Sequence, residues 1–263
     1  MQSRQIKRWK VYSSLSLLAT IIVNFLANYL PIAGMTTGEL SALYPNLFVP
    51  AGITFSIWGL IYISLIILTL YFLFRSNNGT VGSDLFWSKV GPYFTLVNLL
   101  NVCWIYAWHY QILWLSVLIM ILLLSALVGV YTRLHGILRT KQQFSRNIHL
   151  IPFSLYLGWI CVALIANMAA FLVSIDWSGF GLNAVIWTVI VIAIGALISL
   201  RLMRKYGDVV LSAVTIWAFV GILIKRQPMV DTEGNAIVLT LWICIGLLSL
   251  VILYTMIKKP ALR

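Results

Sequence analysis

The chain has few charged residues. Lys, Arg, Asp and Glu make up 9% of its 263 residues, and only 6 of those residues are acidic. A soluble domain carries about 25% charged residues, whereas this composition is 62% hydrophobic. A water-soluble fold of this size could not bury so much apolar surface. The sequence therefore excludes an ordinary soluble domain and predicts a protein that is solvated by a lipid bilayer.

Cysteine and histidine are scarce as well. Cys103, Cys161 and Cys244 lie within apolar runs and form no CxxC pair, so neither a disulfide framework nor a metal site is expected. The three histidines lie at a run end or in or beside a loop. No Ser-His-Asp set, phosphate-binding glycine loop or Asp-rich metal motif occurs. We therefore expect no catalytic residues, no metal and no enzyme of the hydrolase, kinase or ATPase classes.

Long apolar runs are what the chain has in abundance. Each is close to the roughly 20 residues that cross a bilayer core, and together they predict an all-α membrane protein with eight transmembrane helices. The runs are Val11–Pro31, Pro50–Phe74, Gly91–His109, Ile112–Tyr131, Leu150–Ser174, Leu182–Leu200, Val209–Ile224 and Ala236–Ile257. The first outer loop, Ile32–Val49, is broken up by Gly34, Gly38, Pro45 and Pro50 and is expected to be irregular. The segments Ser76–Val90 and Thr132–His149 are expected to be inner loops.

The basic residues are distributed unevenly between the two sides. With the N-terminus inside, 16 of the 18 basic residues fall in inner segments, as the positive-inside rule requires. Only Lys225 and Arg226 fall outside. This pattern predicts that both termini are cytoplasmic and fits a bacterial cytoplasmic membrane. The net charge of +12 is thus explained by topology, and no nucleic-acid partner is expected.

The interior of the predicted spans contains no charged residue but many aromatic residues and several asparagines. No charged residue lies mid-span, which argues against an ion-coupled pump. Asn101, Trp104 and Trp108 share one helix face, and Trp58 lies four residues before Tyr62. A buried amide needs a partner, so these side chains either join helices and fill the core, or line a pocket for a flat apolar ligand. The tryptophans nearer to the run ends are expected to be interfacial anchors; they are Trp87, Trp114, Trp177 and Trp242.

Three segments carry a family resemblance. FVPAGITFSIWGLIY (Phe48–Tyr62), LVNLLNVCWIYAWH (Leu96–His109) and IPFSLYLGWICVALIANMA (Ile151–Ala169) resemble the second, third and fifth helices of the TspO/MBR family, the tryptophan-rich sensory proteins and the translocator protein. Their order and positions agree with that family. The resemblance covers about Val11 to Ser174, so the chain looks like a longer bacterial variety with extra C-terminal helices.

The resemblance implies a domain division and a site. Residues 1–174 would form a TspO-like five-helix bundle, and residues 175–263 a three-helix extension. Family members bind porphyrins, often dimerise, and hold their ligand beneath the first long loop. By matching position, the implied ligand-binding residues are Pro50, Ala51, Trp58, Tyr62, Asn101, Trp104, Trp108, Trp159 and Asn167. The C-terminal sterol-type Tyr…Lys/Arg pattern is absent after Phe171, so cholesterol is not expected as the ligand.

The leading hypothesis is a membrane sensor or binding protein for a flat hydrophobic or tetrapyrrole-type ligand. No cofactor is assigned, and a porphyrin is a candidate only as the ligand. The expected partners are the lipid bilayer, a small hydrophobic ligand and a second copy of the chain as a homodimer. The alternative is a permease or a membrane subunit of a larger transport system. A third option is an enzyme that oxidises a tetrapyrrole, with Trp58 or Trp104 as the redox participant.

Overall fold

The computed structural model describes residues 2–30, 32–75, 81–140, 146–227 and 234–258. Every regular element in these ranges is a helix, which confirms the all-α fold class. The predicted end of the first run at Pro31 lies outside the described residues. The orientation of the termini stays a prediction.

The described residues contain seven helices that are long and apolar enough to cross a membrane. An eighth span follows if α4 (Val81–Lys89) and α5 (Gly91–His109) are counted together, since they are bent by 55° at a short break. The predicted run Gly91–His109 coincides with α5. The expected eight spans therefore equal the number obtained when the bent pair α4 and α5 is counted as one span.

Two loop expectations were wrong. Ser76–Val90 contains α4, because Phe86 and Trp87 on that helix are buried and Phe86 stacks on Phe72 with ring centroids 4.0 Å apart. Trp87 is 0% exposed within the protein and so is not an interfacial anchor. The helix α6 (Leu113–Thr140) likewise continues well into the segment that was expected to be the next inner loop.

The first outer loop also contains a helix that was not expected. Thr36 and Glu39 form a capping box at the start of α2 (Thr37–Ala42): the Thr36 N–H donates to the Glu39 carboxylate at 2.8 Å, and the Glu39 N–H donates to Thr36 Oγ1 at 3.3 Å. The hydrogen bonds from the Thr36 backbone and hydroxyl lower the pKa of Glu39. The loop is therefore partly ordered by its own sequence.

The chain forms two compact units that interleave in sequence. Unit 1 is Met1–Leu40 with Trp58–Leu157, and unit 2 is Ser41–Ile57 with Gly158–Arg263. Because of this interleaving, the first loop contributes to both units. The domain boundary expected at residues 174/175 follows the family resemblance, and it stays a prediction.

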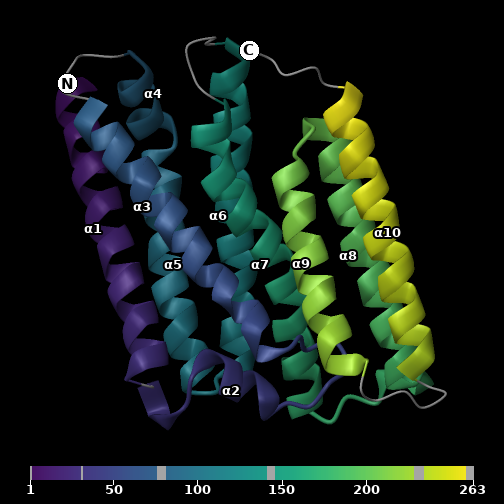
Figure 1. Cartoon of the computed structure of the whole chain (residues 1–263). Helices are drawn as coiled ribbons and strands as arrows, with labels where there is room; N and C mark the ends of the chain where they lie inside the picture. Colours follow the sequence, from purple (N-terminus) through teal and green to yellow (C-terminus); the bar gives the residue numbers. More distant parts are fainter. Residues whose placement is uncertain (1, 31, 76–80, 141–145, 228–233, 259–263) are drawn as a thin grey trace. The chain divides into compact units, whose positions relative to one another are not determined.

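Unit 1 is organised around α5, which packs against both α1 (Gln2–Tyr29) and α6 (Figure 1). Hydrogen bonds between small polar side chains and amides join α1 to α5. Ser13 Oγ donates to the Gly91 carbonyl at 3.1 Å, and Thr20 Oγ1 donates to the Asn98 carbonyl at 3.0 Å. Such bonds hold helices together in a lipid environment, where apolar contact alone discriminates little between protein and lipid.

Unit 2 contains three mutually packed helices, α8 (Ala184–Tyr206), α9 (Val209–Arg226) and α10 (Gly234–Lys258) (Figure 1). Local sequence fixes their ends. The Asn183 side chain caps α8, Gly207 ends it in the left-handed conformation at φ 63°, and Asp208 then caps α9. The C-terminal part of α7 (Arg146–Ser174) belongs to the same unit.

Within unit 2, a short 3-10 helix, η2 (Gly52–Ser56), is seated on α9. The Ala51 N–H donates to the Gly221 carbonyl at 2.9 Å, and Trp217 Nε1 donates to the Thr54 carbonyl at 3.0 Å. Thr54 lies directly against Gly221, where a Cβ would overlap its side chain. Gly221 therefore permits the close approach that fixes this part of the first loop.

Candidate functional site

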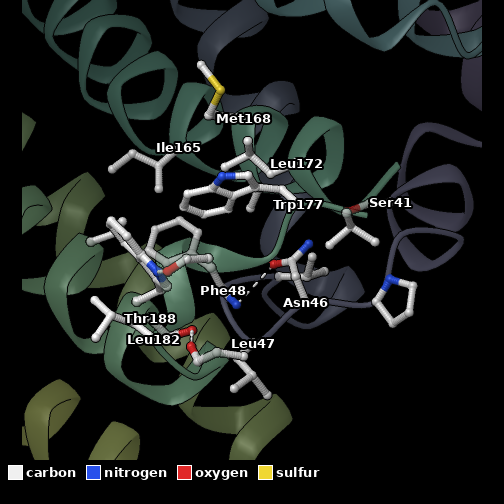
Figure 2. A pocket seen from close by; sticks show the side chains of 18 of the residues that line it. Ser41, Asn46, Leu47, Phe48, Ile165, Met168, Leu172, Trp177, Leu182 and Thr188 are labelled. Carbon is white, nitrogen blue, oxygen red and sulfur yellow. Dashed lines mark hydrogen bonds between the residues drawn. The ribbon is translucent and has the colours of Figure 1, made fainter. Parts of the chain in front are cut away.

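Unit 2 forms a partly open pocket of about 1010 Å³ (Figure 2). It lies among the first loop, the C-terminal half of α7, the turn before α8, the first half of α8 and the end of α9. Pockets that bind small molecules are mostly apolar and measure roughly 300–1,000 Å³. This pocket is thus large enough for a sizeable ligand.

Aromatic rings form part of the pocket wall. Phe48 comes from the first loop, Trp177 from the turn after α7 and Trp187 from α8. The rings of Trp177 and Trp187 lie 5.2 Å apart, and Trp187 Nε1 donates to the Gly179 carbonyl at 2.8 Å. That bond satisfies the indole N–H, so the ring of Trp187 presents an apolar surface.

One face of α7 supplies apolar side chains. Ile165, Met168 and Leu172 follow at steps of three and four residues, and all three are half-buried lining residues (Figure 2). Across the pocket, Thr188 donates its hydroxyl to the Ala184 carbonyl at 2.7 Å, as helix-borne hydroxyls often do. The α8 side of the pocket is therefore also largely apolar in character.

The polar end of the pocket is built by the first loop and Arg226. Asn46 Oδ1 accepts from the Phe48 N–H at 3.1 Å (Figure 2), and Asn46 Nδ2 donates to the Tyr44 carbonyl at 2.9 Å. Arg226 donates from Nε to the Leu47 carbonyl at 3.1 Å and from Nη2 to the Asn46 carbonyl at 2.6 Å. The guanidinium fork thus holds the loop segment that carries Phe48.

Four of the nine residues predicted from sequence form an aromatic row in unit 1. Trp58 stacks on Tyr62 at 5.5 Å and lies 6.0 Å from Trp104, which in turn stacks on Trp108 at 6.2 Å. Trp108 Nε1 donates to the Thr37 carbonyl at 3.3 Å, so the last ring also holds the start of α2. The structure brings these four rings together; the spacing predicted only the shared face within each helix, and the contact between Trp58 and Trp104 joins the two helices.

Asn101 lies beside this row and is fully buried. Its Oδ1 accepts from Asn24 Nδ2 at 2.7 Å and from the Tyr62 hydroxyl at 3.5 Å, and its Nδ2 donates to the Tyr156 hydroxyl at 2.8 Å. The amide therefore links α1, α3 (Ile57–Arg75), α5 and α7. These bonds agree with the alternative in which the asparagines join helices and the rings fill the core.

The other four predicted residues belong to unit 2. Pro50 is buried, and the N–H of Ala51 is bonded to α9. Trp159 is buried and meets Phe55 edge-on at 5.9 Å, while Asn167 is buried on α7. The five residues of unit 1 and these four thus fall in different compact units.

The lining of the pocket contains none of the nine predicted residues. Sequence reasoning missed this pocket because its walls come from a loop and from helices that are distant in the chain. Two features of the sequence could have indicated the pocket. Lys225 and Arg226, the exceptions to the charge pattern, both line the pocket, and so does Trp177, which was expected to be an interfacial anchor.

Within the described ranges, no group of three or more His, Cys, Asp or Glu side chains is placed to hold a metal ion. The described pocket offers aromatic and aliphatic contact along its walls, and cationic groups at one end.

The long apolar helices define a multi-pass α-helical membrane protein. A family model described as TSPO-like protein matches residues 10–254, and the chain belongs to this family. The match continues beyond the three motifs and includes α8, α9 and most of α10. Neither a curated protein nor a solved structure matches the chain.

Proposed function

We propose that the chain is a membrane binding protein that holds a flat, apolar ligand in the pocket of unit 2. The observation that carries this proposal is the pocket itself, which combines a volume of about 1010 Å³ with walls of half-buried aliphatic and aromatic side chains. Pockets that bind small molecules are typically concave and mostly apolar, with a few polar groups, as this pocket is.

The ring-bearing wall favours a flat ligand over a globular one. Phe48, Trp177 and Trp187 present ring surfaces, against which a conjugated or planar molecule gains stacking in addition to apolar burial. Membership of the TSPO-like family supports a binding or sensory role rather than an enzymatic one. A tetrapyrrole is accordingly the first ligand to test.

The aromatic row of unit 1 is the alternative location for the ligand. Sequence predicted Trp58, Tyr62, Trp104 and Trp108 with Asn101 as ligand contacts, and a ligand could slide along the stacked rings. Trp58 is only half-buried, which supports access, whereas Trp104 and Trp108 are buried. Since the bonds of Asn101 already give it a structural role, we rank this location second.

Protoporphyrin quenching of intrinsic tryptophan fluorescence separates the two locations. Ala169 lines the pocket, so Ala169→Phe in the purified full chain fills it and is expected to weaken protoporphyrin binding at least tenfold. Ala236→Phe, on an exposed position of α10, is the matched control and should leave binding unchanged. Trp104→Leu tests the aromatic row.

The outcomes differ clearly. Weaker binding in Ala169→Phe with normal binding in Trp104→Leu supports the pocket, and the reverse result moves the site to the aromatic row. Saturable binding that neither change affects would reject both locations. Thermal unfolding of each variant establishes that it is folded before binding is compared.

The cellular setting belongs to the same proposal. We assign the protein to the bacterial cytoplasmic membrane with both termini in the cytoplasm, which the distribution of 16 of the 18 basic residues supports. This orientation puts the first loop and the pocket near the outer face. A homodimer remains the proposed assembly.

A further inference from the structure

The two cations in the pocket are the two that depart from the charge pattern of the whole chain. Lys225 and Arg226 end α9 and line the pocket, and in the predicted topology they are the basic residues at the outer face. The described lining contains no Asp or Glu beside them. One end of an otherwise apolar pocket is therefore positive.

Arg226 and Lys225 differ in their hydrogen bonding. Arg226 directs its guanidinium to the carbonyls of Asn46 and Leu47 and so anchors the loop. Lys225 is half-buried, and no residue in the described ranges accepts a hydrogen bond from its ammonium group. Of the two cations, Lys225 is thus the one whose charged group is available to a ligand.

Helix electrostatics offers a simpler account of these residues. Cations in the last turn of a helix are favourable to its dipole, and α8 likewise ends in Arg204 and Lys205. That account explains why α9 ends in cations, but it applies equally to helices whose ends line no pocket. The two accounts differ in whether Lys225 affects ligand choice.

We propose that the pocket recognises an amphiphile with an apolar body and a single carboxylate head group, and that Lys225 pairs with the carboxylate. This inference rests on the proposed function, since it takes the pocket as the binding site. A carboxylate is costly in apolar surroundings unless it is paired, and Lys225 provides the pair. The fork of Arg226 is committed to the loop, so Lys225 offers one point charge, which matches the single negative charge of a carboxylate better than the higher charge of a phosphate monoester.

Brominated lipids provide matched probes. Dibromostearate and dibromostearyl alcohol have the same apolar body, and bromine quenches nearby tryptophans such as Trp177 and Trp187 on the pocket wall. With the purified full chain, we expect dibromostearate to reach half-maximal quenching at a concentration about tenfold lower than the alcohol. A tenfold ratio corresponds to about 1.4 kcal/mol, which one charge-assisted contact can supply.

Three variants locate the effect. Lys225→Met should reduce the ratio between the two probes to about one by weakening only dibromostearate, and Lys225→Arg should largely restore it. Lys205→Met removes the same charge from the end of α8 and should leave the ratio unchanged, because Lys205 does not line the pocket. This control also accounts for nonspecific attraction to a basic protein.

Failures of the inference and of the proposed function are distinguishable. Equal affinity for the two probes in the unchanged protein, or a ratio that survives Lys225→Met, would overturn the role of Lys225. If in that case Ala169→Phe still weakened both probes, the pocket would stand as a neutral apolar site. Quenching by both probes that Ala169→Phe leaves unchanged would instead remove the pocket as the binding site.

Discussion

Asn101 shows how a single amide can organise a membrane bundle. It is 0% exposed and uses both ends of its amide, with Asn24 and Tyr62 on the oxygen and Tyr156 on the nitrogen. An amide in hydrocarbon without such partners would cost several kcal/mol. The arrangement therefore stabilises one particular set of helix neighbours and disfavours others.

A double-mutant cycle tests this role. We expect Asn24→Ala and Asn101→Ala to show a coupling energy of about 1 kcal/mol, in the range measured for interhelical hydrogen bonds in membranes. Reversible unfolding in mixed micelles gives the free energies. Asn28 is exposed and its amide donates to the Asn24 carbonyl within α1, so a cycle of Asn28→Ala with Asn101→Ala is the control. Equal coupling in both cycles would contradict a specific link.

The spacing of Asn101, Trp104 and Trp108 was sufficient to predict that they share a face. It could not identify the partner of Asn101, because Asn24 is 77 residues away and its pairing depends on how α1 and α5 pack. The same limit applies to Trp177. Its position near a helix end fits an interfacial anchor and a pocket wall equally well, and only the tertiary fold distinguishes the two.

At the scale of elements, the docking of η2 on α9 depends on Gly221. The Ala51 N–H donates to the carbonyl of this glycine, the Thr54 carbonyl accepts from Trp217 one turn earlier on α9, and Thr54 occupies the space that a Cβ would need. The first loop continues from here to Phe48 in the pocket wall. The close approach at Gly221 therefore supports the geometry of the pocket as well as that of the loop.

Gly221→Ala is expected to destabilise the protein by about 1–3 kcal/mol, the usual cost of overpacking, and to weaken protoporphyrin binding through the displaced loop. Thermal unfolding and fluorescence quenching measure the two effects. Gly246→Ala on α10 is the matched control, because nothing lies within 4 Å of a Cβ there. An equally stable Gly221→Ala protein would show that the loop is not held at this point.

Element prediction succeeded where apolar length alone decides the outcome. The run Gly91–His109 coincides with α5, and the other apolar runs each correspond to a long helix. It was wrong for α2 and α4, which are short and are stabilised by local capping or by burial of a few aromatic rings. A hydropathy average over a long window detects neither a capping box nor the burial of a few rings.

At the scale of the whole molecule, the two compact units do not follow the order of the chain. Residues Ser41–Ile57 belong with the C-terminal helices, while α1 before them and α3 from Trp58 onward belong to unit 1. The family match likewise spans both units. The C-terminal helices thus share the pocket unit with the first loop, an association that sequence motifs confined to the N-terminal half could not reveal.

The charge pattern predicts the orientation of the whole chain. We expect green fluorescent protein to be fluorescent when it is fused to either terminus in a bacterial host, because it folds only in the cytoplasm. Alkaline phosphatase fused after Gln227 should be active, since that position follows α9 at the predicted outer face. Fluorescence at one terminus alone would require an odd number of spans and would contradict the eight-helix topology.

The central claim is that the pocket of unit 2 holds the ligand, and an experimental structure of the full chain with bound protoporphyrin tests it most directly. The account predicts density for the probe between Phe48, Met168 and Trp177. Density along the rings of Trp58 and Trp104, with the pocket filled only by lipid or detergent, would contradict it.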